Sequence, residues 1–146
     1  MAVEILELHH VGLVCRTAEA DPMRDYYSQV LNLTEDKGRG AIPGLRGYFM
    51  DVGKQDVQVH MFGKDGPSPF SQGPGKDPAE NHLAFAVADI LEAEDELKRQ
   101  GVDYYALEGV GAPNLKQLFM HDPVGNIIEL HQIGLCRCKQ SDRPAP

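Results

Sequence analysis

Cysteine is scarce in this sequence, with three residues among 146. Three cysteines spaced this unevenly are too few for the disulfide framework that holds many small secreted domains together. Cys15 lies in an apolar, strand-like stretch, which indicates a small core residue. Cys136 and Cys138 lie in a polar C-terminal tail, where metal binding is the minor alternative, and we expect the tail from Arg137 to Pro146 to be disordered.

Basic residues and long apolar runs are also in short supply. Lys and Arg number 14 against 22 Asp and Glu, which gives a net charge of -8 and a pI near 5.1. This balance argues against nucleic acid or an anionic membrane surface as a partner. No apolar run approaches the roughly 18 residues of a membrane span, and the N-terminus lacks the basic start and apolar core of a signal peptide. We therefore expect a cytoplasmic protein that binds a small molecule.

The hydrophobic share of 42% is ordinary for a globular protein, and 146 residues can bury a sizeable core. Thr17 is the expected N-cap of a first helix and Asn32 its stop, while Asp89 and Gly101 bound a second helix. Hydrophobic periodicity supplies the remaining elements. Helices are expected at Thr17–Leu31 and Ile90–Gln100, and strands at Ile5–Cys15, Leu45–Val52, Val57–Phe62, Asn81–Ala88, around Leu107, Leu115–His121 and Ile127–Ile133.

The chain contains the same unit twice. Gly44–Met50 recurs as Asn114–Met120, and His10 opens the first half as His82 opens the second. Each half reads β-α-β-β-β, which predicts an α+β fold of two tandem βαβββ modules. A Gly-, Pro- and Ser-rich loop between them is either a linker or a mobile flap. We expect one domain over residues 1–135, with module one at about 5–62, the linker at 63–79, module two at about 80–133, and a polar tail at 136–146.

Period-two alternation places titratable side chains on one face of four strands, beside small residues that leave room for a ligand. A carboxylate among branched aliphatics, as in Ile127–Leu130, is costly to bury unless a cation or donor meets it. Two or three imidazoles with one carboxylate suit a first-row divalent ion and leave positions open for water or substrate. The residues of this expected metal site are His10, His60, His82 and Glu129.

The other histidines are expected to lie outside the site. Alternation turns His9 toward the helices as a structural residue, places His131 at the rim, and leaves His121 exposed at a turn. His60 itself is open to three interpretations: a fourth ligand, a general acid or base, or a polar wall of the pocket.

Two further pairs of residues have expected roles, and one of them, Arg46 and Lys116, occupies matched repeat positions. Tyr48 and Phe119 are expected to pack inside the expected site. Arg46 and Lys116 are solvated edge charges or, alternatively, contacts for an anionic substrate.

The motifs together resemble a known superfamily. They are His10-Val-Gly-Leu-Val, Tyr26-Tyr-Ser-Gln-Val-Leu-Asn-Leu33, Asn81-His-Leu-Ala-Phe-Ala-Val87 and Asp122-Pro-Val-Gly-Asn-Ile-Ile-Glu-Leu130. From about Ile5 to Gln132 the chain resembles the vicinal oxygen chelate superfamily, which includes glyoxalase I, extradiol dioxygenases, fosfomycin-resistance enzymes and bleomycin-binding proteins. The resemblance implies βαβββ modules curling into a cupped, mostly antiparallel sheet with helices outside, usually completed in a homodimer, and metal ligands at His10, His82 and Glu129.

The reaction is less defined than the superfamily. Glyoxalase I has a glutamate where this chain has His60, whereas extradiol dioxygenases favour a histidine there but carry a tyrosine where this chain has Phe119. The leading hypothesis is a lyase or isomerase of the glyoxalase I type, in which Glu129 and His60 are catalytic and the cofactor is Fe, Ni, Co, Zn or Mn. The alternatives are an extradiol-type dioxygenase and a non-catalytic protein that binds an antibiotic or another small molecule.

Overall fold

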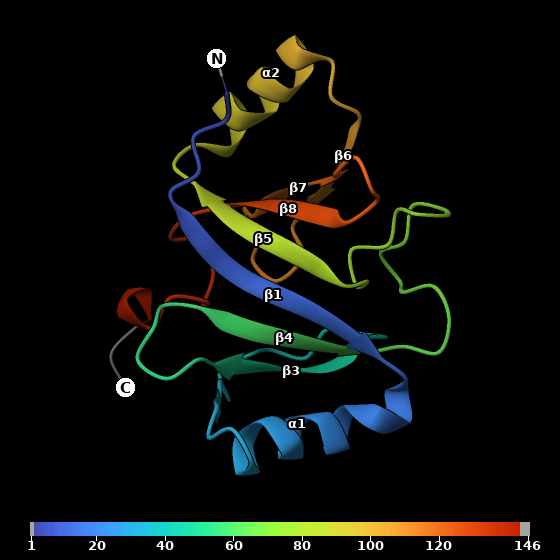
Figure 1. The fold of residues 1–146 in the computed structure, drawn as a ribbon, viewed down its shortest axis with the longest axis vertical. Helices are drawn as coiled ribbons and strands as arrows, with labels where there is room; N and C mark the ends of the chain where they lie inside the picture. The colour runs from blue at the N-terminus through green and yellow to red at the C-terminus, as the bar shows by residue number, and fades with distance from the viewer. Residues whose placement is uncertain (1, 144–146) are drawn as a thin grey trace.

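The computed structural model of the protein describes residues 2–143, which contain eight strands in one sheet (Figure 1). Two α-helices and two short 3-10 helices accompany the sheet in this part of the chain. In chain order the elements are β1 (Glu7–Cys15), η1 (Thr17–Glu19), α1 (Ala20–Gln29), β2 (Thr34–Glu35), β3 (Arg46–Asp51), β4 (Gln58–Gly63), β5 (His82–Val87), α2 (Ile90–Gln100), β6 (Tyr104–Glu108), β7 (Lys116–His121), β8 (Ile127–Gln132) and η2 (Gln140–Asp142).

The strand order is symmetric about the centre of the sheet. It runs β2-β3-β4-β1-β5-β8-β7-β6, with β1 and β5 antiparallel at the middle. On each side the next pair is parallel, β1 with β4 and β5 with β8, and the outer pairs are antiparallel. This order confirms the expected α+β architecture of two βαβββ modules forming a curved, mostly antiparallel sheet. Both modules lie side by side within one chain (Figure 1).

The two helices begin and end at residues suited to those positions. The expected cap at Thr17 is wrong by one residue: Arg16 precedes the first turn, and its backbone N–H donates to the Glu19 carboxylate at 2.9 Å. Asn32 stops α1 as expected, with a left-handed φ of 59°. The Asp89 carboxylate accepts from two backbone N–H groups at the start of α2, and Gly101 ends that helix with a φ of 69°.

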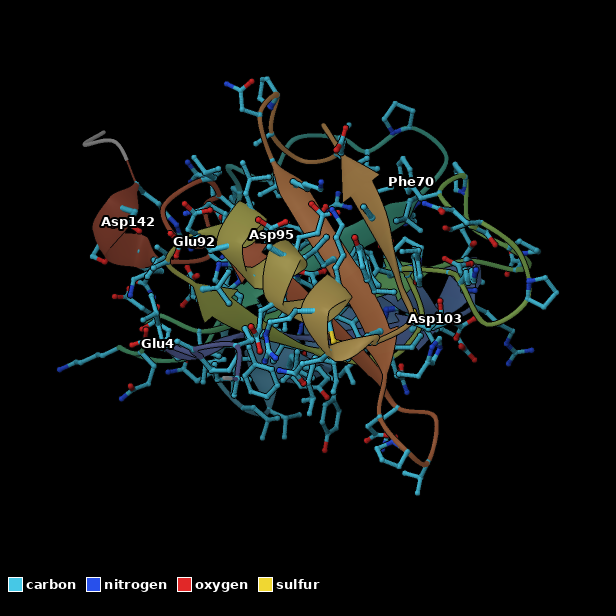
Figure 2. The ribbon with its side chains drawn as sticks, turned by 90° about the horizontal axis from the view of Figure 1, so that it is seen from above. Glu4, Phe70, Glu92, Asp95, Asp103 and Asp142 are labelled. Carbon is cyan, nitrogen blue, oxygen red and sulfur yellow. The ribbon has the colours of Figure 1, made fainter. Side chains whose placement is uncertain are left out.

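Helix α2 buries an apolar stripe against the sheet, whereas α1 buries only Ala20 fully. Ala93 and Leu97 of α2 pack on Leu118 and Leu130, whereas Asp95 projects from the outer face of the helix (Figure 2). Neither α-helix in residues 2–143 combines the length and the apolar composition needed to cross a bilayer. Because the helices pack on one face of the sheet, the opposite, concave face is free to hold polar side chains.

Matched ion pairs fasten each helix to its own module. Arg46 and Tyr48 of β3 bind the Asp21 carboxylate of α1, and Lys116 of β7 binds Glu94 of α2 at 2.6 Å. Tyr48 therefore lies on the helix side of the sheet, which corrects the expectation that it packs inside the cup. Arg46 and Lys116 are occupied by helix carboxylates, so a role in substrate binding is not supported.

The Gly- and Pro-rich loop before β5 is held by one carboxylate. Asp77 accepts hydrogen bonds from the backbone N–H and the hydroxyl of Ser68, at 2.7 and 2.6 Å, and from Lys64 at 2.9 Å. Burial alone would raise the pKa of Asp77, but these donors outweigh it and lower the pKa to about 2. The loop is consequently a fastened wall rather than a free linker.

The C-terminal segment departs from its expected disorder as far as the structure describes it. Arg137 binds Asp36 at 2.8 Å, and Arg143 binds Asp51 at 2.5 Å. Cys138 between them is only 2% exposed. The polar composition that suggested a disordered tail consists largely of side chains paired with carboxylates of module one. The expectations for 144–146 fall outside the described residues.

Candidate metal centre

Three side chains from three adjacent strands meet on the concave face. His10 of β1 lies with its Nε2 atom 3.2 Å from His82 Nε2 on β5 and 3.5 Å from Glu129 Oε2 on β8. His82 Nε2 is 3.8 Å from Glu129 Oε1. The strand register explains the meeting, because Ala84 of β5 pairs with both His10 and Glu129. The structure thus brings together the three residues expected from the sequence as a ligand set.

A missing side chain makes the close approach possible. Gly12 pairs with His82 across the seam between the modules. A Cβ atom at Gly12 would lie 2.0 Å from His82 Cε1, far inside van der Waals contact. The glycine is therefore required because the imidazole of His82 fills the space where a side chain would project.

The electrostatics of the three groups match a site for a cation. Burial lowers the pKa of His10 to about 4 despite the opposing carboxylate of Glu129, so the imidazole is neutral near pH 7. Burial alone would raise the pKa of Glu129, but the surrounding imidazoles, His10 first, hold it below its usual value. Glu129 Oε2 is buried and has no hydrogen-bond donor. A buried carboxylate oxygen facing two imidazoles fits a divalent ion.

His60 lies beside this triad with its ring nitrogen already engaged. Its ring stacks between Phe49 and His10, with centroids 3.5 and 4.0 Å away. His60 Nε2 donates to the Gln58 side-chain oxygen at 2.9 Å. His60 and His10 also lie near Cys138, and one ligand atom from each of the three lies within 4.8 Å of the others. The structure places His60 at the site without assigning it as a ligand.

Comparison with known proteins agrees with this geometry. Residues 9–118 match the family described as the Glyoxalase/Bleomycin resistance protein/Dioxygenase superfamily. The chain belongs to this superfamily. A protein named Glyoxylase I 4 from Arabidopsis thaliana is 26% identical over 137 residues, which cover 93% of this chain and 73% of the relative.

Solved structures of methylmalonyl-CoA epimerase share the superfamily fold. The enzyme from Mycobacterium tuberculosis matches with a TM-score of 0.67 at 20% identity, covering 100% of this chain and 93% of its own. A Streptomyces coelicolor epimerase variant in complex with 2-nitronate-propionyl-CoA matches with a TM-score of 0.66 at 16% identity, covering 88% and 95%. At these identities the likeness establishes the fold.

Contacts outside the triad orient its members. The Nδ1 atom of His82 donates to the backbone oxygen of Glu80 at 2.7 Å, which leaves Nε2 free to face an ion. Gln117 donates to Glu129 Oε1 at 3.3 Å. His10 Nδ1 instead lies 2.8 Å from His9 Nδ1. Each member of the triad is thereby held by a partner outside it.

Two histidines lie elsewhere than the sequence predicts. A register shift in β1 between Leu8 and His10 turns His9 to the same side as His10, fully buried, because a bulge breaks the alternation of faces. His131, expected at the rim, is 2% exposed and stacks on His9 with centroids 4.2 Å apart. Both are buried next to the His10 ring rather than at the helices or the edge. His121 is exposed as expected.

A cavity of about 510 Å³ opens in front of the triad. Its walls are mainly apolar and come from both modules and the fastened loop, and Phe119 lines it as expected. Arg39 reaches the cavity wall, and its buried Nε atom has no hydrogen-bond partner. Arg39 and Gln117 were not expected here, His9 was expected on the helix side, and Cys138 was expected in a polar tail with metal binding as the minor alternative. Only the consecutive pair His9-His10 and the Cys136-Arg-Cys138 spacing would have signalled any of them.

Proposed function

We propose that the protein is a metal-dependent isomerase or lyase of the glyoxalase I kind. Its substrate is a small molecule that presents two neighbouring oxygen atoms. The observation that carries the proposal is the convergence of His10, His82 and Glu129, with a buried Glu129 oxygen that has no donor. A divalent ion held by these residues would act as a Lewis acid for the substrate oxygens and stabilise negative charge that develops on them.

The surrounding residues provide the rest of the chemistry. The apolar cavity walls exclude water around the reacting carbon. His60 is the candidate general base, because burial lowers its pKa well below the usual value and so keeps its imidazole neutral and able to accept a proton. Gln58 accepts from His60 Nε2 and so directs the ring. The other nitrogen of His60 is then the atom that takes up and returns a proton.

Arg39 suggests a second requirement for the substrate. Its Nε atom lacks a partner although it is buried, and its guanidinium lies over the Phe49 ring at 4.9 Å. Burial without a carboxylate lowers the pKa of Arg39. An anionic or carbonyl oxygen of the substrate would satisfy this donor. We therefore expect a substrate with an apolar body and an acidic or carbonyl group distant from the chelated oxygens.

Extradiol-type ring cleavage is the second candidate. A histidine at position 60 favours it, while Phe119 argues against it because a phenyl ring offers no hydroxyl group to the substrate. The names of the relatives, a glyoxalase and an epimerase, favour proton transfer over oxygen chemistry.

Elemental analysis of freshly purified protein separates these functions. One equivalent of nickel, cobalt or zinc, with isomerase activity that chelators abolish and the ion restores, is the expected result. Iron with oxygen consumption on catechols would favour the dioxygenase. Stoichiometric binding of a small molecule without metal, and insensitive to chelators, would contradict both and indicate a binding protein.

A further inference from the structure

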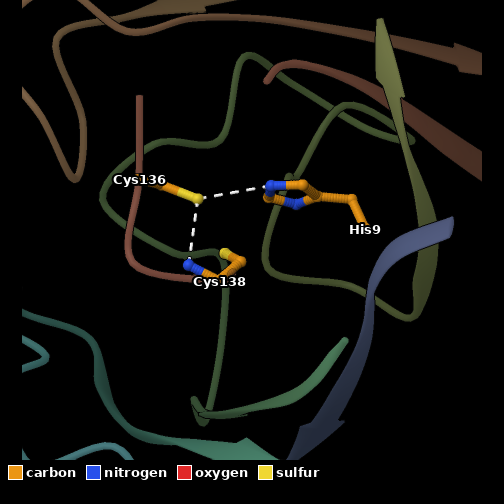
Figure 3. Close-up of side chains that lie close together, drawn as sticks. All are labelled: His9, Cys136 and Cys138. Carbon is orange, nitrogen blue, oxygen red and sulfur yellow. Dashed lines mark hydrogen bonds between the residues drawn. The ribbon is translucent and has the colours of Figure 1, made fainter. Parts of the chain in front are cut away.

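A second group of side chains of types that can bind a metal lies beside the first. His9, Cys136 and Cys138 gather between β1 and the C-terminal segment (Figure 3). Cys136 Sγ is 3.3 Å from His9 Nε2 and accepts a hydrogen bond from the backbone N–H of Cys138 at 3.2 Å. One potential ligand atom from each residue lies within 4.8 Å of the other two. None of these residues belongs to the triad of His10, His82 and Glu129.

The group is rigidly supported. His9 is 0% and Cys138 2% exposed. The segment that carries both thiols is held by two ion pairs on either side of Cys138. Arg137 binds Asp36, and Lys139 binds Glu7 at 2.6 Å. A ligand set that is already in place loses little conformational entropy when it binds an ion.

The donor atoms differ in kind from those of the triad. Two sulfur atoms and one imidazole favour thiophilic ions such as Cu⁺ or Zn²⁺, whereas a carboxylate with imidazoles accepts borderline and harder ions. Bond lengths of about 2.3 Å to sulfur and about 2.0 Å to nitrogen place tetrahedral ligand atoms about 3.5 Å apart. The 3.3 Å between Cys136 Sγ and His9 Nε2 agrees with this separation.

We propose that His9, Cys136 and Cys138 form a thiophilic metal site, and that filling it weakens metal binding at His10, His82 and Glu129. On binding, the thiols release their protons to solvent and coordinate as thiolates. The first part of the proposal stands on the thiol geometry alone. The second part rests on the proposed metal-dependent function.

A single shared proton couples the two sites. His9 Nδ1 and His10 Nδ1 are 2.8 Å apart, so one of them donates and the other accepts. When His10 Nε2 holds an ion, His10 Nδ1 carries the proton and donates it to His9, whose own proton must then be on Nε2. When His9 Nε2 holds an ion instead, His9 Nδ1 donates, and the proton of neutral His10 moves to Nε2. Each arrangement removes the ligand atom that the other site needs.

Cadmium titration followed by ultraviolet absorbance tests the thiol site. The protein is kept reduced with a phosphine, and thiolate-to-cadmium charge transfer is recorded. We expect a band that saturates at one equivalent in wild type, in Cys15→Ser and in Glu129→Gln, and that is lost in Cys136→Ser and Cys138→Ser. Cys15→Ser is the matched control, because it removes a thiol outside the group. Absence of the band, or its survival in the Cys136→Ser, Cys138→Ser double variant, would overturn the site.

Manganese binding followed by paramagnetic resonance tests the coupling. Free Mn²⁺ is measured with and without one equivalent of Cu⁺. We expect Cu⁺ to weaken Mn²⁺ binding about 10- to 100-fold in wild type and Cys15→Ser, the size of effect that outer partners of a ligand have. The double thiol variant should show no such change. A cadmium band without loss of Mn²⁺ affinity would refute the coupling. Wild type that binds Cd²⁺ at the thiols but never binds Mn²⁺ or another divalent ion at His10, His82 and Glu129 would refute the proposed function and leave the thiol site standing.

Discussion

The two modules present the same histidine in different ways. His82 in module two donates from Nδ1 to a backbone oxygen, that of Glu80, which can only accept. His10 in module one faces the imidazole of His9, which can accept or donate. The tautomer of His82 is therefore fixed by the main chain, while the tautomer of His10 depends on a side chain with contacts of its own. The two modules therefore share the position of the histidine but differ in what fixes its tautomer.

The strands that follow differ in the same manner. His60 of β4 and Glu129 of β8 hold equivalent places, since His60 pairs with Gly12 and Glu129 with Ala84. Only the carboxylate contributes to the triad, and only module one needs a glycine at the paired position. Module two thus provides the negative charge of the centre, and module one provides the space for the His82 ring.

The largest effect should come from removing that charge. We expect Glu129→Gln to weaken binding of a divalent ion more than 100-fold, beyond the roughly 10- to 100-fold cost of losing an outer partner. His60→Gln at the equivalent place should cost less, because His60 Nε2 is engaged by Gln58. Isothermal titration with Mn²⁺ measures both. Equal losses would mean that His60 is a ligand of the same rank.

Filling the space at the seam should have the next effect. Gly12→Ala places a methyl group on the His82 ring and should destabilise the fold by about 1–3 kcal/mol, the usual cost of overpacking. Metal affinity should fall with it because His82 must move. Urea denaturation together with metal titration gives both quantities. Ala84→Gly, the reciprocal change in module two, is the control and should leave His10 in place. Unchanged stability and metal affinity in Gly12→Ala would contradict the contact between Gly12 and the His82 ring.

Truncating the residue before each histidine should separate the two modules. His9→Ala removes the partner of His10 Nδ1 and should weaken metal binding about 10- to 100-fold. Asn81→Ala removes only an acceptor for the Val14 backbone N–H and should leave metal affinity within about twofold of wild type, because an amide partner of β1 is not a partner of the ligand. Binding constants for the two variants give the answer, and equal effects would show that His9 only packs.

The smallest effect, a loss of stability, should come from the carboxylates on the helix side of the sheet. Glu94 accepts from Lys116 and Tyr104 and is 12% exposed, so Glu94→Gln should cost about 1 kcal/mol. Asp21→Asn in module one should cost less, because Asp21 is largely exposed. The hydrogen bond from Lys116, and then that from Tyr104, lower the pKa of Glu94.

The pH dependence of that effect has a defined sign. A lowered pKa means that the Glu94 carboxylate stabilises the fold above its unfolded pKa, about 4.3, and that this contribution is lost as the pH falls below that value. Urea denaturation of wild type and Glu94→Gln at pH 7 and near pH 3 should show the difference shrinking in acid. A constant difference would contradict the assignment.

The triad could be predicted because three signals agree on it. Repetition and period-two alternation place His10, His60, His82 and Glu129 on one face, the aliphatic neighbours of Glu129 single out its carboxylate, and the superfamily resemblance implies His10, His82 and Glu129 as the ligands. His9 could not be placed, because a bulge reverses the facing of one residue and leaves no mark in an alternating pattern. The burial of Cys138 was not expected, for a different reason. Its neighbours Arg137 and Lys139 look like a solvated tail until their carboxylate partners, far away in the chain, are known.

The seam between β1 and β5 also dictates when the centre can exist during folding. His10 and His82 are separated by 72 residues, and closing so large a loop is slow. Neither module alone contains His10, His82 and Glu129, so this three-residue site forms only after both halves have docked. Bound metal should consequently slow unfolding while leaving the folding rate unchanged. An ion bound at the proposed site would therefore slow the unfolding of the finished molecule and would have no part in its nucleation.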